Sequence, residues 1–188
     1  KNIGSRSAFG CEHGPLMNAE AMLLIHDRDG DEREGLDECL VPTDYRRAGV
    51  ITDDLLKRIF RCFHADVNVV FICDACHSGS MCDLKFKYDE ERDVCEEAHP
   101  HSRCAARVVS ISGCKDDEVS YVGYNLLDEG KRRSVLTAFL LKTLQDDQKE
   151  SIREVQTTLV GHVTRSGYKQ HPEVMTSFPV FENDKVFV

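Results

Sequence analysis

Apolar residues along the chain form short β-branched runs that alternate with helical stripes. Residues 67–72 (VNVVFI) and 107–112 (RVVSIS) are rich in valine and isoleucine, which is typical of strands buried on both faces of a sheet. A third apolar run at 21–25 (AMLLI) predicts another strand, and residues 39–42 predict a short extended stretch. The tail that starts at His171 is interrupted by proline and is expected to end in a strand at a sheet edge.

Three segments carry apolar residues at helical spacing. The first begins after Thr52, whose hydroxyl can cap a helix, and the others span about 134–144 and 151–166. The expected buried faces are Leu55, Leu56, Ile59 and Phe60 in the first helix, Leu136, Phe139, Leu140 and Leu144 in the second, and Ile152, Val155, Leu159 and Val163 in the third. Residues 85–106 show mixed charge and no period, which indicates a linker or surface insertion. Strands that alternate with helices predict a layered α/β fold.

Composition narrows the class of protein. A chain of 188 residues suits one domain, and 24 Lys plus Arg against 33 Asp plus Glu give a net charge of −9, which argues against a nucleic-acid partner and suits calcium or basic peptides. The nine cysteines are odd in number and irregularly spaced, so we expect reduced thiols in a cytoplasmic protein. No apolar run approaches the roughly 20 residues of a membrane helix. We expect a protein that is a monomer and does not bind membranes.

The strand at 67–72 leads into the hexapeptide DACHSG, which contains the best candidate nucleophile, Cys76. Catalytic groups of α/β sheets gather beyond the carboxyl ends of strands, and Ser78 and Gly79 permit a tight exit turn there. The alternative is that Cys76 only fills the core, as many free cysteines do. His77 is a weaker base than a histidine from another strand, because neighbouring residues at a strand end point apart.

Two metal-site patterns are rejected on their spacing. Residues 27–38 (DRDGDEREGLDE) place acids at EF-hand positions, but Glu32 stands where that loop needs glycine. A zinc site at Cys73, Cys76 and Cys82 lacks a second pair of ligands at a suitable distance.

DACHSG closely resembles the nucleophile motif of metacaspases, the caspase-like cysteine peptidases of protists, fungi and plants. Further segments resemble the family in the same order: DGDEREGLDECLVPTDY, GVITDDLL, VVSISGCKDDEVS, RSVLTAFLLKTL and SGYKQHPEVMTS. The pattern is most similar to type I metacaspases of the kinetoplastid branch. The resemblance implies a caspase-like (caspase-hemoglobinase) α/β fold, with a mainly parallel central sheet flanked by helices. It also implies one peptidase domain over 1–188, in which 1–84 are the remainder of a large-subunit region, 85–106 the linker and 107–188 a small-subunit-like region.

The chain departs from the family around the catalytic histidine. The first strands of the domain have almost no room here, so we expect a fragment that lacks part of the N-terminal region. The family motif SGHG is also absent. His13 in CEHG is the favoured base, His26 after the run AMLLI is the second candidate, and an inactive remnant, with Phe9 of SAFG in the place of the histidine, is the third.

The resemblance assigns further roles. Asp74 matches the position that selects Arg or Lys before the scissile bond, which suits a desolvated carboxylate that binds guanidinium; the alternative is a strand-end cap. Four residues match family calcium positions: Asp37, Asp53, Asp54 and Asp83. Calcium takes six to eight oxygen ligands. The alternative is that Asp53 and Asp54 only favour a helix N-terminus while Asp37 and Asp83 are solvated.

These assignments predict a calcium-dependent cysteine endopeptidase that cleaves protein or peptide substrates after Arg or Lys through a dyad of Cys76 and a histidine. The leading rival is an inactive pseudopeptidase with a regulatory or scaffolding role. A redox-sensing thiol protein, with a disulfide among Cys73, Cys76 and Cys82, is the third possibility.

Overall fold

The computed structural model describes residues 19–26, 36–75, 78–79, 81–115, 118–124, 126–127, 130–145 and 151–187. For residues 19–26, 36 and 37 it describes the backbone only. Among the described residues, no helix combines the length and the apolar character needed to cross a membrane.

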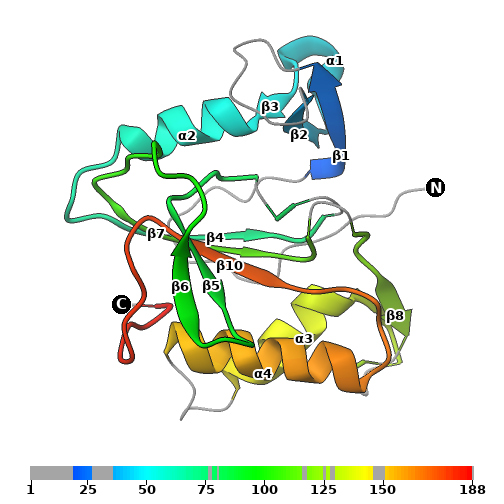
Figure 1. Ribbon diagram of the computed structural model, residues 1–188. Coiled ribbons are helices and arrows are strands. Elements are labelled where there is room, and N and C mark those ends of the chain that lie inside the picture. The colour runs from blue at the N-terminus through cyan, green and yellow to red at the C-terminus, as the bar shows by residue number, and fades with distance from the viewer. Residues whose placement is uncertain are drawn as a thin grey trace.

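A five-stranded sheet forms the centre of the molecule (Figure 1). Its order is β4 (Asn68–Cys73), β7 (Arg107–Ser112), β10 (Glu173–Thr176), β5 (Phe86–Asp89) and β6 (Val94–Glu97). The β4 and β7 strands run parallel, and the other three pairings are antiparallel. The α/β fold is therefore confirmed, but the sheet is mixed and not mainly parallel. Its antiparallel part consists of a hairpin and a returning C-terminal strand, which need no helical crossover.

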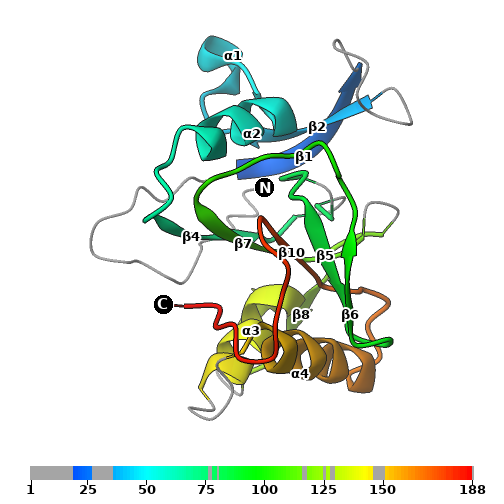
Figure 2. The ribbon, with the colours of Figure 1, turned by 60° about the vertical axis from the view of Figure 1, so that its left-hand side comes forward.

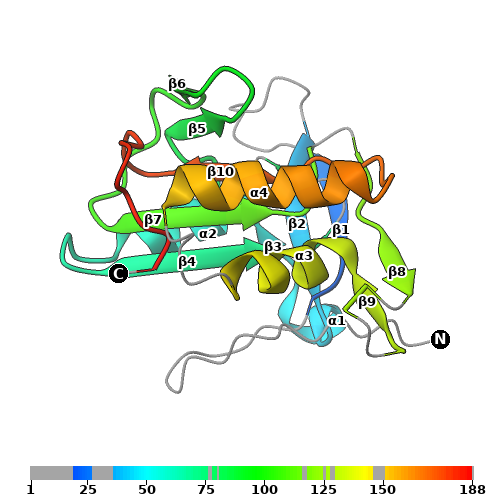
Figure 3. The same cartoon turned by 90° about the horizontal axis from the view of Figure 1, so that it is seen from below.

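Helices cover both faces of this sheet. The α2 helix (Asp53–Arg61) lies on one face, and α3 (Val135–Leu144) and α4 (Ile152–Arg165) lie together on the other (Figures 1 and 3). Along β7, Val108 packs into the cluster beneath α2, whereas Val109 and Ile111 pack against α3 and α4. This alternation with a period of two explains why β7 is apolar on both faces.

Two smaller sheets flank the central one. The strands β1 (Ala19–His26), β2 (Leu36–Pro42) and β3 (Ile51–Thr52) form an antiparallel sheet beside α2, with the short helix α1 (Tyr45–Ala48) between β2 and β3 (Figure 2). Leu40 of β2 joins the apolar cluster beneath α2 and thereby attaches this sheet to the domain. A hairpin of β8 (Val122–Tyr124) and β9 (Arg132–Ser134) leads directly into α3.

The β7 strand and the last two helices confirm the predictions, whereas β4, expected to be buried on both faces, lies at the edge of the sheet and is mostly half-buried. All four predicted core residues of α4 are buried, and Ser151 with Glu154 forms a capping box at its start. Thr52 caps α2 as expected. The predicted face of α2 is half wrong, because Leu56 and Phe60 are buried while Leu55 and Ile59 are 39% and 42% exposed.

Two segments contain structure that the sequence did not indicate. Residues 85–106, expected to be a linker or surface insertion, hold β5 and β6, which extend the sheet as a hairpin. The tail was expected to end in an edge strand, but its strand, β10, lies near its start and in the sheet interior between β7 and β5, and the described residues from 177 to 187 form only an isolated bridge from Lys185 to Ser151. The division of the chain into large-subunit, linker and small-subunit regions stays a prediction.

Candidate active site

The segment around Cys76 follows β4 at its carboxyl end. Cys76 and His77 themselves lie outside the described residues, but Ala75 and Ser78 on either side are described. The Ser78 hydroxyl is buried and donates to the Ala75 carbonyl oxygen over 2.9 Å, and it accepts from the Gly113 amide over 3.2 Å. This serine therefore ties the turn that carries Cys76 to the exit of β7.

Asp74 is held by three hydroxyl groups from distant parts of the chain. Ser120 donates to Oδ1 over 3.3 Å, Ser134 donates to the same oxygen, and Thr137 donates to Oδ2. Ser134 is the N-cap residue of α3, yet its side chain caps no backbone amide because its hydroxyl is turned to Asp74. The positive end of the α3 dipole also favours an anion at this place. The carboxylate is half-buried, and the three hydroxyls fix its orientation. A residue that only capped the end of the strand would not need these bonds to distant segments.

Two other thiols near this turn, those of Cys73 and Cys82, are buried. Burial raises the pKa of Cys73 to about 12, and burial likewise raises the pKa of Cys82 far above its usual range. A buried thiol with a raised pKa is a poor nucleophile and a poor metal ligand. The described residues also contain no group of three or more His, Cys, Asp or Glu side chains placed to hold a metal ion.

The histidine of the dyad cannot be assigned from the described residues. His13 lies outside them, and His26 is described only by its backbone, as the last residue of β1. The β1 strand pairs with β2 in the smaller sheet and not with β4. The roles of Cys76, His13 and His26 stay predictions.

Three of the four predicted calcium ligands lie at the start of α2. Asp53 and Asp54 open this helix, and Asp83 from the segment after the nucleophile is buried beside them. The side chain of Asp37 lies outside the described residues. Burial, together with the nearby Asp83 and Glu38 carboxylates, raises the pKa of Asp53 to about 7, against the opposing effects of the Asp54 amide and the Lys57 ammonium. Because Asp83 is buried, it is not solvated, and the alternative explanation is wrong for this residue.

A cation already lies within this cluster. The Lys57 ammonium is 2.7 Å from Asp83 Oδ2 and 3.4 Å from Asp54 Oδ1, and His99 Nδ1 is 3.3 Å from Asp83 Oδ1. Asp53 Oδ2 is buried without a hydrogen-bond donor among the described residues. The oxygen donors thus suit a hard cation in their chemistry, but the place between Asp54 and Asp83 is taken by Lys57.

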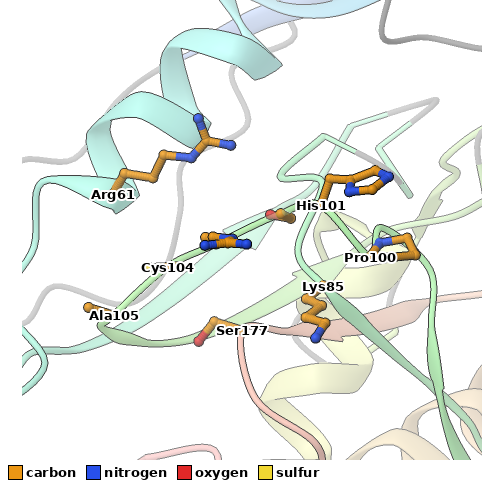
Figure 4. A pocket seen from close by; sticks show the side chains of 9 residues that line it. Arg61, Lys85, Pro100, His101, Cys104, Ala105 and Ser177 are labelled. Carbon is orange, nitrogen blue, oxygen red and sulfur yellow. The ribbon is translucent and has the colours of Figure 1, made fainter.

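A hollow of about 850 Å³ lies at the other end of the sheet (Figure 4). Arg61 reaches into it from α2, and Lys85 and His101 line it from the segments opposite. Cys104, which precedes β7, also lines it, whereas Asp74 lies beside the exit of β7, so the length of this strand separates the two places. The hollow is therefore not the pocket that Asp74 would serve.

Comparisons with known proteins bear on the identity of this domain. Residues 23–85 match the family model described as metacaspase, peptidase C14 domain. The chain is 29% identical to metacaspase-5 of Trypanosoma brucei brucei over 166 residues, covering 80% of this chain and 32% of that protein. It is 35% identical to metacaspase-1 of Plasmodium falciparum over 96 residues, covering 50% of this chain and 16% of that protein. The chain is thus similar to metacaspases, over residues 23–85 to the family model and over most of its length to curated members of the family.

The fold has a solved counterpart as well. A crystal structure of protein GSU0716 from Geobacter sulfurreducens superposes with a TM-score of 0.55 at 23% identity, over 84% of this chain and 62% of that one. At this identity the likeness concerns the fold alone. The matches span between 16% and 53% of the length of the curated metacaspases, with a coverage of 46% for metacaspase-2 of Trypanosoma brucei brucei.

Several site residues were not anticipated from the sequence. Ser120, Ser134 and Thr137 reach Asp74 from a loop and from the start of α3, so no local pattern links them. The contact of Lys57 with the acidic residues could have been expected from the sequence. Lys57 lies three positions after Asp54 and four after Asp53 on a predicted helix, and side chains at these spacings meet.

Proposed function

We propose that this chain is a calcium-dependent cysteine endopeptidase that cleaves after Arg or Lys, with Cys76 as nucleophile and His13 as base. The observation that supports it best is the Asp74 carboxylate, fixed by three hydroxyls next to the turn that carries Cys76. A carboxylate that is already oriented binds a guanidinium or ammonium group without losing further side-chain entropy. The same charge repels an acidic side chain.

The proposed chemistry follows from the properties of the two side chains. A free thiol has a pKa of about 8.5, so a neighbouring imidazole is needed to form the thiolate at neutral pH. The thiolate attacks the peptide carbonyl, and the imidazolium returns the proton to the leaving amine. The bonds from Ser78 to Ala75 and Gly113 would keep the turn in place while this happens.

Calcium, when bound by Asp53, Asp54 and Asp83 together with Asp37, would supply charge that orders the segment after the nucleophile. Asp83 supports this proposal, because it joins that segment to the start of α2 and has a left-handed backbone, with φ of +40°.

Fluorogenic peptides with Arg, Lys or Asp before the cleaved bond test the proposal. The wild-type protein is expected to release fluorophore after Arg or Lys when calcium is present, and Cys76→Ala is expected to release none. Asp74→Asn removes the charged partner, and loss of a buried charged pair costs about 2–5 kcal/mol, or roughly 30- to 3,000-fold in kcat/KM. The matched control is Asp66→Asn, whose side chain is 90% exposed and which should change nothing. Absence of turnover in the wild type under all these conditions contradicts the proposal and favours the pseudopeptidase.

A further inference from the structure

The acidic cluster at the start of α2, formed by Asp53, Asp54 and Asp83, contains the ammonium group of Lys57. The Lys57 side chain is only 10% exposed and points between Asp54 and Asp83, whose side chains are 34% and 3% exposed. An ammonium held in this way is no solvated surface lysine, because it pairs with one buried and one half-buried carboxylate.

Position along the helix explains why this lysine reaches the cluster. Asp53, Asp54 and Lys57 lie within one turn of α2, at the spacings of three and four residues that bring side chains together. Asp83 is brought to the same place from another part of the fold, where Cys82 and Leu84 on either side of it are buried in the apolar cluster beneath α2. The ion pair between Lys57 and Asp83 thus joins α2 to the segment that follows the nucleophile.

An ammonium and a calcium ion cannot share these oxygens. Calcium binds carboxylate oxygens at about 2.3–2.6 Å, and the nitrogen of Lys57 already lies 2.7 Å from Asp83 Oδ2. Two cations at such distances from one carboxylate repel each other strongly in a buried place. The lysine stem has four carbons with free rotation, so the ammonium can leave for solvent, but only by giving up its ion pairs with Asp54 and Asp83.

We propose that Lys57 is a built-in counter-cation that occupies the calcium position between Asp54 and Asp83, so that calcium binds this chain only by expelling the ammonium. This inference rests on the proposed calcium dependence and adds the residue that limits it. The buried Asp53 Oδ2, which accepts no hydrogen bond among the described residues, is the oxygen that an incoming ion gains. Lys57 acts as a positioning residue: it holds Asp83 in place at low calcium and sets how much calcium is needed to replace it.

Isothermal titration calorimetry with calcium chloride on the full chain tests this inference without any activity measurement. Lys57→Met keeps the length of the side chain and removes its charge, and it should bind calcium at least tenfold more tightly than the wild type. Lys57→Arg keeps a cation and should bind no more tightly than the wild type. Lys85→Met is the matched control, because Lys85 pairs with Glu97 outside the cluster, and its affinity should stay within about twofold of the wild type.

The outcomes separate this inference from the function on which it rests. Equal calcium affinity of the wild type and Lys57→Met overturns the inference and leaves the calcium proposal standing. No binding by any of the proteins overturns both. Should Lys57→Met fail to fold, the wild type labelled with ¹³C at the lysine ε position gives the answer: calcium must shift the Lys57 resonance, identified with Lys57→Gln, and leave that of Lys85 in place. An unmoved Lys57 resonance at saturating calcium overturns the inference.

Discussion

Ser78→Ala should uncouple the nucleophile turn from the sheet. The Ser78 hydroxyl is buried, donates to the Ala75 carbonyl and accepts from the Gly113 amide, so its removal breaks two hydrogen bonds. The Ala75 carbonyl keeps a weak donor in the Cys114 thiol, and the Gly113 amide keeps an acceptor in the Cys73 carbonyl. Because a hydrogen bond contributes about 0.5–1.5 kcal/mol net, a total loss of about 2 kcal/mol is expected. For a chain of this size that lowers Tm by about 4–8 °C.

Ser177→Ala is the matched control for this change. The Ser177 hydroxyl likewise donates to a carbonyl, that of Ala106, and accepts from an amide, that of Val108, but at the opposite end of β7. Both variants should lose similar stability in urea unfolding. Only Ser78→Ala should also lose turnover, by roughly a hundredfold, because small displacements of reacting groups cost about that much. If Ser78→Ala loses stability and keeps the kcat/KM of the wild type, the anchored turn does not position the nucleophile, and the reasoning is refuted.

Two further predictions concern packing and charge. Leu159→Ala in α4 removes a fully buried side chain and should lower the free energy of unfolding by about 3 kcal/mol. Leu55→Ala on the exposed side of α2 should change it by less than about 0.5 kcal/mol. Similar losses for the two variants in urea unfolding would contradict the faces assigned to these helices. The hydrogen bond with Glu90 raises the pKa of His171 over the opposing effect of burial, so this pair stabilises the fold below about pH 6.5 and loses that contribution as pH rises through the raised pKa. The decline in unfolding free energy between pH 6 and 8 should therefore flatten in His171→Gln, and an unchanged slope would show that the pair is not formed.

The sequence predicted best those strands and helices whose apolar residues all pack in the same kind of surroundings along the whole element. The β7 strand is buried on both faces, and α4 packs one stripe on the sheet, so their periods are clear. The β6 strand was missed because it lies at the sheet edge with three of its four residues exposed. The β10 strand has only four residues, and it buries Glu173, which pairs with Lys87 of the neighbouring β5. That ion pair lets a charged residue lie inside the sheet, which no local pattern reveals.

The candidate site was predictable where the residues are neighbours in sequence. The turn after β4, with Ser78 and the proposed roles of Cys76 and Asp74, follows from a single hexapeptide. The hydroxyls around Asp74 and the burial of Asp83 depend on how distant segments come together, which sequence spacing does not encode.

The rate at which iodoacetamide alkylates each cysteine, followed against pH by peptide mass spectrometry, tests the central claim most directly. An activated nucleophile at the end of β4 predicts that Cys76 reacts first, with an inflection below the pH of about 8.5 typical of a free thiol, while the buried Cys73 and Cys82 stay unmodified. A Cys76 as slow as these two in the folded protein would contradict the account and leave only the similarity to metacaspases.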